Sequence, residues 1–436
     1  MFDLASDRES PDASARERVR ALFVGHAGSP TGFARVLHSL LPRLSHRYDV
    51  HHLGINFHGA APDCGWTVHH NPRPDDRYAE HALETLIATL QPRLIFVLDE
   101  VRVAARLQPV LQTRGPGARA VLYAAIDGRL PLSPEDVRAL SGFDRLVAFT
   151  RFGRDALVDA AGAVQAQTPG FRLPPIAIVP HGVDTSVFHP LARPAPAPGA
   201  WVPDPADPRV AAGRAAARRQ LFPERRDLDE AFIVLNANRN QPFKRIDVTL
   251  RGFAAFARDK PADVLLYLHM GTAAPAPGTT PLADALGIRD RVLVTARSPH
   301  HPDVTSDRLN VIYNACDVGL NTSEGEGWGL VSVEHAATGA AQIVPRHTAC
   351  AELWADAALL VEPVDRDRAD AEEYERSGLT VTPDGVAGAL ERLYRDRELR
   401  RGLSIAAYRI ARREDLQWDE IGRMWDREFR ALLASG

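Results

Sequence analysis

The sequence predicts an α/β protein of two domains, each built around a mainly parallel β-sheet. Short apolar or β-branched runs alternate with longer amphipathic stretches along almost the whole chain, which is typical of successive βαβ units. A proline-rich stretch interrupts this alternation near the middle of the chain. A chain of 436 residues is too long for one ordinary hydrophobic core, and its length fits two α/β domains.

The first half contains seven strand-like runs, with helical patterns in several of the gaps between them. Two of the helical patterns are Phe33–Leu41, which we expect Pro42 to end or kink, and Ala79–Leu90. The expected strands are Val19–Val24, Asp49–Leu53, Trp66–His69, Leu94–Leu98, Ala118–Ala125, Leu146–Phe149 and Ile176–Val179.

Residues 190–208 carry seven prolines and therefore favour a linker over a helix or a central strand. We place the domain boundary just before them, which gives a first domain of residues 19–189 and a second of residues 190–436. A helical pattern over Leu416–Leu433, with Trp418 and Trp425, lies near the end of the chain. The expected strands of the second domain are Phe232–Asn236, Val264–His269, Val292–Thr295, Val318–Leu320, Gln342–Val344 and Leu359–Val361.

The composition excludes several classes of protein. The formal net charge of −4 gives no reason to expect nucleic acid as a partner. The three cysteines show no CxxC spacing, which argues against a disulfide framework or a zinc site and suits a reducing compartment. No apolar run approaches the ~18 residues of a transmembrane helix, and the polar residues 1–18 indicate a disordered leader rather than a signal peptide. We therefore expect a cytoplasmic location.

The most informative segment is Asn321–Pro345, with the sequence NTSEGEGWGLVSVEHAATGAAQIVP. A strand ends just before it, and three glycines precede a helix predicted from Leu330 to Thr338, which Gly339 would end. Glycines before a helix N-terminus leave backbone N–H groups accessible, so this turn is suited to bind a diphosphate. The three glycines are Gly325, Gly327 and Gly329.

Charged residues flank this predicted anion site. Glu326 lies in the turn and Glu334 in the helix, so the two carboxylates could serve opposite ends of one ligand. Arg239 and Lys244 lie in the loop at the carboxyl end of a predicted strand, where ligands bind in open α/β sheets. Two cations at this place could neutralise a departing diphosphate without a metal ion.

These segments resemble the GT-B glycosyltransferases of the retaining family 4, also called glycosyl transferases group 1. The E-x7-E motif of that family is matched by Glu326-Gly-Trp-Gly-Leu-Val-Ser-Val-Glu334, and its Arg and Lys five residues apart are matched by Arg239 and Lys244. Val179-Pro-His-Gly-Val-Asp184 resembles the family's hinge after the first domain, and Val147-Ala-Phe-Thr-Arg-Phe-Gly153 resembles a run just upstream of that hinge. The resemblance extends from about residue 19 to the C-terminus.

The resemblance implies the GT-B fold, in which two Rossmann-like, doubly wound domains face each other across a cleft and the last helix returns to the first domain. The acceptor would lie mostly on the first domain and the donor mostly on the second. Glu334 would bind the donor ribose, Glu326 the transferred sugar, and Arg239 with Lys244 the leaving diphosphate. The donor loop would also contribute Gly327, Trp328, Gly329 and Leu330, with Trp328 packing beside the loop or, alternatively, stacking on the base.

In the first domain the resemblance points to Gly32, and the sequence departs from the family at Asp127. Gly32 closes the segment Gly25-His-Ala-Gly-Ser-Pro-Thr-Gly32, where the family places a glycine-rich loop against the donor phosphate; the sequence is not GxGxxG, so no dinucleotide fingerprint is supported. Many relatives carry a His after the strand that here ends in Asp127-Gly128. Asp127 could accept a hydrogen bond from an acceptor or sugar hydroxyl, or it could be a turn residue, and both interpretations stay open.

The sequence thus predicts a hexosyltransferase-type glycosyltransferase without a cofactor or a metal ion. It would move a sugar from a nucleoside-diphosphate sugar to a hydroxyl acceptor, which is a glycan, a lipid-linked compound or a small molecule. Retention of the anomeric configuration follows from the resemblance alone. The alternative from another class is a catalytically silent sugar-nucleotide-binding protein, and a phosphorylase or a nucleotide-sugar epimerase could share the fold.

Other side chains have competing interpretations. Glu324 is expected to be a solvated loop carboxylate, and His181 a hinge residue satisfied by backbone groups. The basic stretch Phe33–Arg47 is expected to be a helix docked on its sheet. The alternative is a weak peripheral membrane-surface patch that would serve a lipid-linked acceptor.

Overall fold

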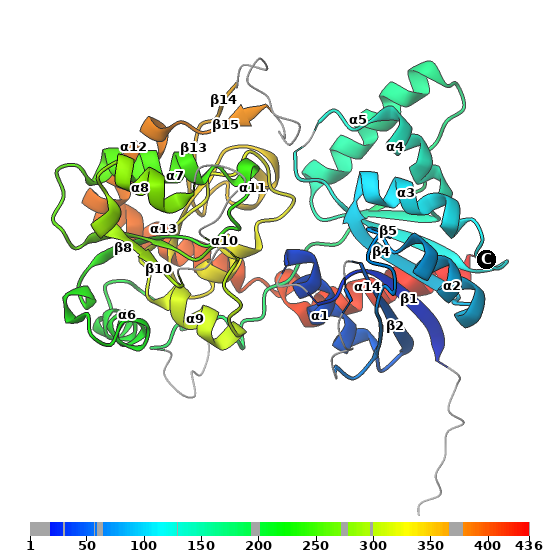
Figure 1. Cartoon of the computed structure of the whole chain (residues 1–436), viewed down its shortest axis with the longest axis horizontal. Helices are drawn as coiled ribbons and strands as arrows, with labels where there is room; N and C mark the ends of the chain where they lie inside the picture. Colours follow the sequence, from blue (N-terminus) through cyan, green and yellow to red (C-terminus); the bar gives the residue numbers. More distant parts are fainter. Residues whose placement is uncertain are drawn as a thin grey trace, which may run out of the picture.

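The computed structural model describes residues 18–28, 31–55, 57–58, 64–128, 130–192, 201–271, 278–296, 300–365 and 378–435. Within these residues the chain forms two α/β domains side by side, the first at the right of Figure 1 and the second at the left. The expected disordered leader, apart from Arg18, and part of the proline-rich linker lie outside the described residues.

A seven-stranded parallel sheet in the order β3-β2-β1-β4-β5-β6-β7 forms the core of the first domain. Its central strands are apolar along almost their whole length because both of their faces are buried. All seven strands were predicted, with ends that differ by at most two residues. They are β1 Val19–His26, β2 Tyr48–Ile55, β3 Thr67–His69, β4 Leu94–Glu100, β5 Arg119–Ala125, β6 Arg145–Ala148 and β7 Ile176–Ile178.

Helices cover both faces of this sheet. Alternate residues of the strands pack toward α2 to α5 on one face, and toward α1 and the last helix of the chain on the other. The helices of the first domain are α1 Gly32–Leu44, α2 Glu80–Leu90, α3 Val101–Leu111, α4 Pro134–Ala139 and α5 Arg151–Gln167.

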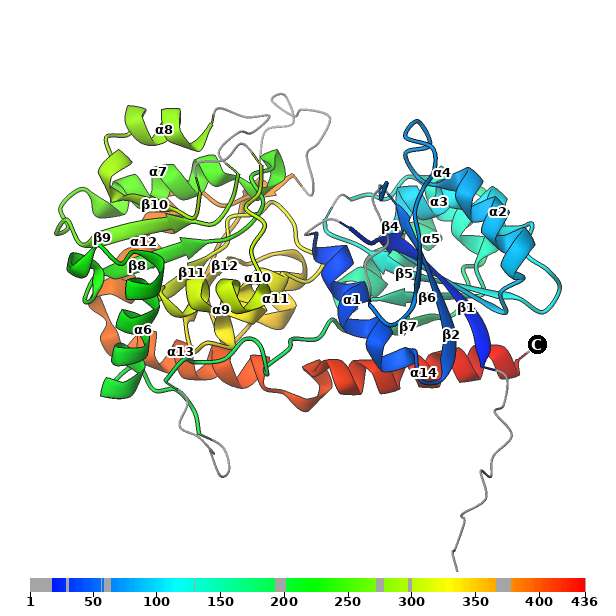
Figure 2. The same cartoon turned by 60° about the horizontal axis from the view of Figure 1, so that its bottom comes forward.

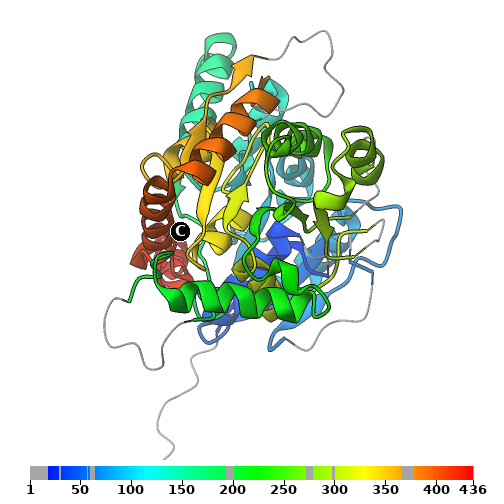
Figure 3. The ribbon, with the colours of Figure 1, turned by 90° about the vertical axis from the view of Figure 1, so that its left-hand side faces the viewer.

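The second domain is built on a six-stranded parallel sheet in the order β10-β9-β8-β11-β12-β13, and it lies nearest the viewer in Figure 3. All six strands were predicted; they are β8 Phe232–Asn236, β9 Val264–Leu268, β10 Val292–Val294, β11 Val318–Leu320, β12 Ala341–Pro345 and β13 Leu359–Val361. The antiparallel pair β14 Val364–Asp365 and β15 Leu379–Thr380 was not predicted, because two-residue strands are too short to show an alternating pattern. The helices are α6 Pro208–Leu221, α7 Ile246–Ala257, α8 Thr279–Ala285, α9 Ser306–Asn314, α10 Leu330–Ala336, α11 Thr348–Leu353, α12 Pro383–Arg395 and α13 Arg397–Ala411.

The last helix, α14 (Trp418–Ala434), follows the second domain in sequence but packs on the first, as Figure 2 shows along the lower edge of the molecule. The rings of Trp425 and Phe429 lie 4.9 and 6.0 Å from the ring of Phe96 in β4. These aromatic contacts join the end of the chain to the core of the first domain.

Helix α1 differs from the prediction in its length. It continues through Pro42 to Leu44, since the missing N–H of Pro42 removes only one hydrogen bond, to the backbone oxygen of His38 in the preceding turn. Its apolar residues are buried, and Arg43 and Arg47 pair with Asp419 and Asp426 of α14 at 2.7 and 2.6 Å. Burial of these apolar residues supports the docked interpretation of the helix. In the described part of the chain no helix is both long and apolar enough to cross a membrane.

Candidate functional site: the cleft between the domains

A cleft of about 240 Å³ lies between the two domains, at the carboxyl ends of the strands of both sheets. Loops after β4 and β5 and the start of α1 line it from the first domain, and the loops after β8 and β11 line it from the second. The predicted site residues that line it are Gly32, Asp127, Arg239, Lys244, Glu326, Gly327, Trp328, Gly329 and Leu330. Glu334 is the predicted site residue that lines a neighbouring cavity instead.

Glu326 and Lys244 form an ion pair in this cleft, with Lys244 Nζ 2.6 Å from Glu326 Oε1. Asn321 and Ser323 donate hydrogen bonds to the same oxygen at 3.0 and 2.8 Å. Among the described residues every side-chain donor to this carboxylate reaches Oε1, so Oε2 remains for a ligand hydroxyl. Burial acts to raise the pKa of Glu326, but the charge of Lys244 and these hydrogen bonds outweigh it and hold the pKa below its ordinary value. The carboxylate is therefore ionised at neutral pH and acts only as a hydrogen-bond acceptor.

Two residues with a left-handed backbone hold the loop around Glu326. Thr348 has a φ of 50°, which is rare for a β-branched residue, and its Oγ1 accepts a hydrogen bond from the backbone N–H of Glu326 at 3.1 Å. Arg245 has a φ of 49° and places its guanidinium 2.8 Å from Glu324. Glu324 is 2% exposed, so the prediction of a solvated carboxylate was wrong. A buried carboxylate needs a paired charge, and Arg245 supplies it.

The glycines of the loop allow close contact between the two domains. A Cβ atom on Gly325 would lie 1.8 Å from the backbone oxygen of Asp127, and one on Gly327 would lie 3.2 Å from that of Ile126. Gly329 has a φ of 89° and begins α10 without a side-chain cap. The sequence analysis explained these glycines by the approach of a phosphate. The structure shows that Gly325 lies against the backbone of Asp127 in the first domain, where a side chain would not fit. Helix α10 ends at Ala336 rather than at the predicted Thr338.

Arg239 follows β8 and lines the same cleft. Burial lowers its pKa, an effect that the negative charges of Glu326 and Glu100 oppose, and an arginine remains protonated in either case. Within the residues that the structure describes, Arg239 has no ion-pair partner. Its guanidinium donors are therefore available to an anionic ligand, beside the ammonium group of Lys244.

Glu334 lies on α10 and is 4% exposed. Tyr313 of α9 donates a hydrogen bond to Oε2 at 2.9 Å, and Arg35 of α1 forms a short ion pair with Oε1. Burial raises the pKa of Glu334, and Arg35 and Tyr313 offset only part of this effect. The sequence predicted neither partner, because Arg35 is one of several basic residues on its helix and Tyr313 belongs to an unremarked helical stretch.

Trp328 is buried in the glycine-rich loop 321–329, between β11 and α10. It is 4% exposed, and its ring lies 5.7 Å from that of His181 in the hinge segment. His181 Nδ1 lies 2.8 Å from Tyr123 Oη, so its partner is a side chain and not the backbone groups that were expected. The hinge segment 179–184 and the loop 321–329 are thus in contact through the rings of His181 and Trp328.

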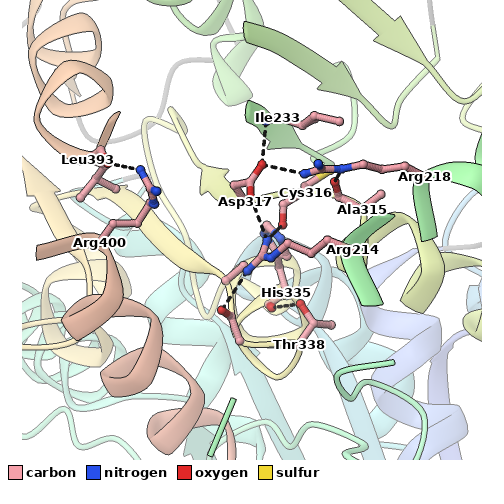
Figure 4. A network of polar contacts seen from close by, with 12 residues as sticks. Arg214, Arg218, Ile233, Ala315, Cys316, Asp317, His335, Thr338, Leu393 and Arg400 are labelled. Carbon is pink, nitrogen blue, oxygen red and sulfur yellow. Dashed lines mark hydrogen bonds and ion pairs between the residues drawn. The ribbon is translucent and has the colours of Figure 1, made fainter. Parts of the chain in front are cut away.

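A buried charge network holds β11 and α10, the strand and the helix on either side of the glycine-rich loop 321–329 (Figure 4). Asp317, just before β11, accepts from Arg218 at 2.8 Å and from the backbone N–H of Ile233 at 2.8 Å. Arg214 lies 3.5 Å from Asp317 and donates to the backbone oxygen of Gly339, just after α10, at 3.3 Å. Because these arginines belong to α6, the network ties β11 and α10 to a third element and limits movement of the loop between them. No motif in the sequence identifies it.

The residues that the structure describes contain no group of three His, Cys, Asp or Glu side chains placed to hold a metal ion. The cationic side chains that line the cleft and could face a diphosphate are Arg35, Arg239 and Lys244.

Comparisons with known proteins place this geometry in context. D-inositol 3-phosphate glycosyltransferase from Streptomyces griseus is 33% identical over 217 residues, which are 47% of this chain and 39% of the relative. The protein of the same name from Kineococcus radiotolerans is 31% identical over 280 residues, which are 62% of this chain and 53% of the relative. The chain thus spans about half, or less, of the length of these curated relatives. No family model matches the chain.

Solved structures match nearly the whole chain. Anabaena HepE in complex with UDP and glucose superposes with a TM-score of 0.66 over 95% of this chain and 100% of that chain, at 15% identity. Sucrose-phosphate synthase from Thermosynechococcus elongatus gives a TM-score of 0.67 over 96% and 100%, also at 15% identity. The chain has the GT-B fold. The cleft described above therefore lies between the two Rossmann-like domains of a GT-B protein.

Proposed function

We propose that this GT-B protein is a glycosyltransferase that moves a sugar from a nucleoside-diphosphate sugar to a hydroxyl acceptor, with retention of the anomeric configuration. The curated relatives carry glycosyltransferase names, and the HepE structure contains UDP and glucose, which supports this class of reaction and of donor. Retention rests on the resemblance of the E-x7-E segment to family 4.

The observation that carries the proposal is the pairing of Lys244 with Glu326 beside Arg239 in one cleft between the domains. A diphosphate leaving group needs fixed positive charge, and sugar hydroxyls need carboxylate acceptors. The cleft offers both: the ion pair of Lys244 with Glu326 and the guanidinium of Arg239, which has no ion-pair partner among the described residues. Of the 52 basic residues of the chain only Lys244 and Lys260 are lysines, so the ammonium group in the cleft is unusual for this sequence.

In the proposed step the bond between the anomeric carbon and the diphosphate oxygen breaks, and its electron pair leaves with the diphosphate. The acceptor oxygen bonds to the same carbon and gives up its proton to an oxygen of the departing diphosphate. Arg239 and Lys244 stabilise the negative charge that develops on the diphosphate, Glu326 Oε2 accepts from a sugar hydroxyl, and Glu334 accepts from the ribose. Asp127 lines the cleft from the first domain, and we assign it an acceptor or sugar hydroxyl.

We place the acceptor in a cavity of about 270 Å³ on the first domain. Glu100, Ala125 and Asp127 line both this cavity and the donor cleft, so the two spaces adjoin. Glycans, lipid-linked compounds and small molecules with hydroxyl groups remain candidates.

We propose further that transfer needs no metal ion and no cofactor, because Arg239 and Lys244 supply the positive charge. We place the protein in the cytoplasm, on the grounds of its cysteines: Cys64, Cys316 and Cys350 are all free thiols, which suits a reducing compartment.

A donor screen tests the proposal. Thermal unfolding is measured with UDP-, GDP- and ADP-sugars, since a ligand at about 100 times its Kd adds about 2.7 kcal/mol to the free energy of unfolding. The stabilising donor is then incubated with the protein, and slow release of free nucleoside diphosphate is measured. Release by the wild type and by the matched control Lys260→Ala, together with its loss in Lys244→Ala, supports a transferase. Stabilisation without any release would identify the silent sugar-nucleotide-binding protein, and a donor set that never stabilises the protein would contradict the proposal.

A further inference from the structure

Glu326 and Glu334 face different cavities between the domains. Glu326 lines the cleft of about 240 Å³, and Glu334 lines a neighbouring cavity of about 280 Å³. Among the described residues, Arg35 and Leu330 are those that line both cavities. Arg35 therefore lies at the junction between the proposed sugar end and the proposed ribose end of the donor.

The contacts of Arg35 fix its position at this junction. It projects from α1 of the first domain, and its guanidinium forms the ion pair with Glu334 of the second domain. The same guanidinium lies 5.5 Å from the centre of the Phe188 ring, which in turn lies 5.6 Å from the ring of Tyr313. Tyr313 donates to the other oxygen of Glu334 at 2.9 Å. Arg35, Phe188 and Tyr313 thus form a frame around one carboxylate.

We infer that Arg35 is a positioning residue contributed by the first domain, which holds the Glu334 carboxylate in place for the ribose hydroxyls of the donor. The inference rests on the proposed function. A carboxylate offers about four lone-pair sites, so Glu334 accepts from Arg35 and Tyr313 and keeps two sites for ribose. Donor affinity then depends on a residue of the first domain that reaches Glu334 of the second.

The electrostatic setting of Glu334 supports this role. Its carboxylate is buried, a condition that favours the neutral acid, and the guanidinium of Arg35 favours the charged form that accepts hydrogen bonds. The other titratable groups near the pair are Tyr313, which keeps its proton because burial raises its pKa, the carboxylate of Asp184, and His38, His269, His301 and His335, whose pKa values burial lowers. These histidines are neutral above about pH 6.5. Burial is the largest influence on the pKa of Glu334, and Arg35 is the charged group that opposes it.

The test measures binding of free UDP, GDP and ADP by calorimetry to the wild type, Arg35→Ala and Arg35→Lys. We expect Arg35→Ala to lower the affinity for the nucleotide that the wild type binds by about tenfold or more, which is the effect of losing one hydrogen bond to a charged group. Arg35→Lys keeps the charge but loses the planar fork, so its affinity should lie between the two. Circular dichroism and thermal unfolding establish that each variant is folded.

Two further measurements separate positioning from a general effect on domain contact. Glu352 accepts the backbone N–H groups of Arg151 and Phe152 at 3.1 and 2.9 Å, also across the domain gap but away from Glu334. Glu352→Ala should therefore leave nucleotide affinity within about twofold of the wild type. In a Glu334→Gln background, Arg35→Ala should cause little additional loss, because the two residues act as one unit.

The pH profile gives a readout that a merely structural role would not move. Without Arg35 the pKa of Glu334 rises. As the pH is lowered, Glu334 is therefore protonated earlier, and the loss of nucleotide affinity should begin at a higher pH in Arg35→Ala than in the wild type. An unchanged affinity and pH profile in Arg35→Ala, or an equal loss in Glu352→Ala, would overturn the inference. A wild type that binds none of the three nucleotides would instead contradict the proposed function, and the inference with it.

Discussion

Lys244→Ala should reduce turnover far more than donor affinity. Lys244 Nζ lies 2.6 Å from Glu326 Oε1, inside the cleft and beside Arg239. Arg239, which has no ion-pair partner among the described residues, remains to bind the diphosphate of the ground state. The ammonium group is worth most when charge develops on the leaving diphosphate, so its loss raises the barrier.

The expected magnitude follows from the loss of one fixed donor in a water-poor site. Such a loss costs about 2.7–4 kcal/mol in the barrier, or about 10²–10³ in kcat. Breaking the buried pair also leaves Glu326 with an uncompensated charge, which costs on the order of 3 kcal/mol of stability. The double variant Lys244→Ala with Glu326→Gln removes this charge, so it should regain stability without regaining turnover.

The assay measures kcat and KM for donor hydrolysis or transfer over a range of donor concentrations, for the wild type, Lys244→Ala and Lys260→Ala. Lys260 pairs with Glu391 at 3.0 Å and does not line the cleft, so its variant should match the wild type in both constants. A Lys244→Ala enzyme with normal kcat and only a raised KM would show that Lys244 merely binds the donor, and the assignment to the transition state would be refuted.

Four further predictions concern other parts of the site. Glu334→Ala should weaken free nucleoside diphosphate by on the order of 1.5–3 kcal/mol, whereas Glu326→Ala should not; equal weakening by calorimetry would mean that the two carboxylates are assigned to the wrong ends of the donor. Activity should persist in excess EDTA, and a loss that Mg²⁺ or Mn²⁺ restores would reject a metal-independent step. Gly325→Ala should lower kcat at least tenfold, about 1.4 kcal/mol, because the new Cβ meets a backbone oxygen of the other domain at 1.8 Å; Gly388→Ala, with no atom near its new Cβ, is the matched control. Burial raises the pKa of Asp99 to about 7, above its value of 3.8 when exposed, so the folded state is penalised as pH rises from about 4 to 7. Asp99→Asn should therefore gain stability over the wild type across that range, on the order of 2–4 kcal/mol by thermal unfolding at pH 8, and a difference that does not change with pH would contradict the assigned pKa.

The sequence by itself determined the fold class, the number of domains and almost every strand. Apolar runs such as Leu94–Leu98 and Val318–Leu320 need little context, because a strand buried on both faces must be apolar along its length. It also brought Arg239, Lys244 and Glu326 forward as candidates, since charged residues at the carboxyl ends of parallel strands converge at one edge of a sheet.

Only the tertiary structure decided which partners these charged residues have. The ion pair of Glu334 with Arg35 joins residues 299 positions apart, and nothing local to either residue indicates the other. Glu324 looked like a solvated loop carboxylate until the left-handed backbone of Arg245 brought a guanidinium to it. In the sequence Gly325 looks like any other loop glycine. Its specific requirement, the close approach of the Asp127 backbone, is visible only in the structure. Periodicity records which face of an element is buried, whereas the charge and the backbone that meet across a domain gap depend on how two separately folded sheets are placed against each other.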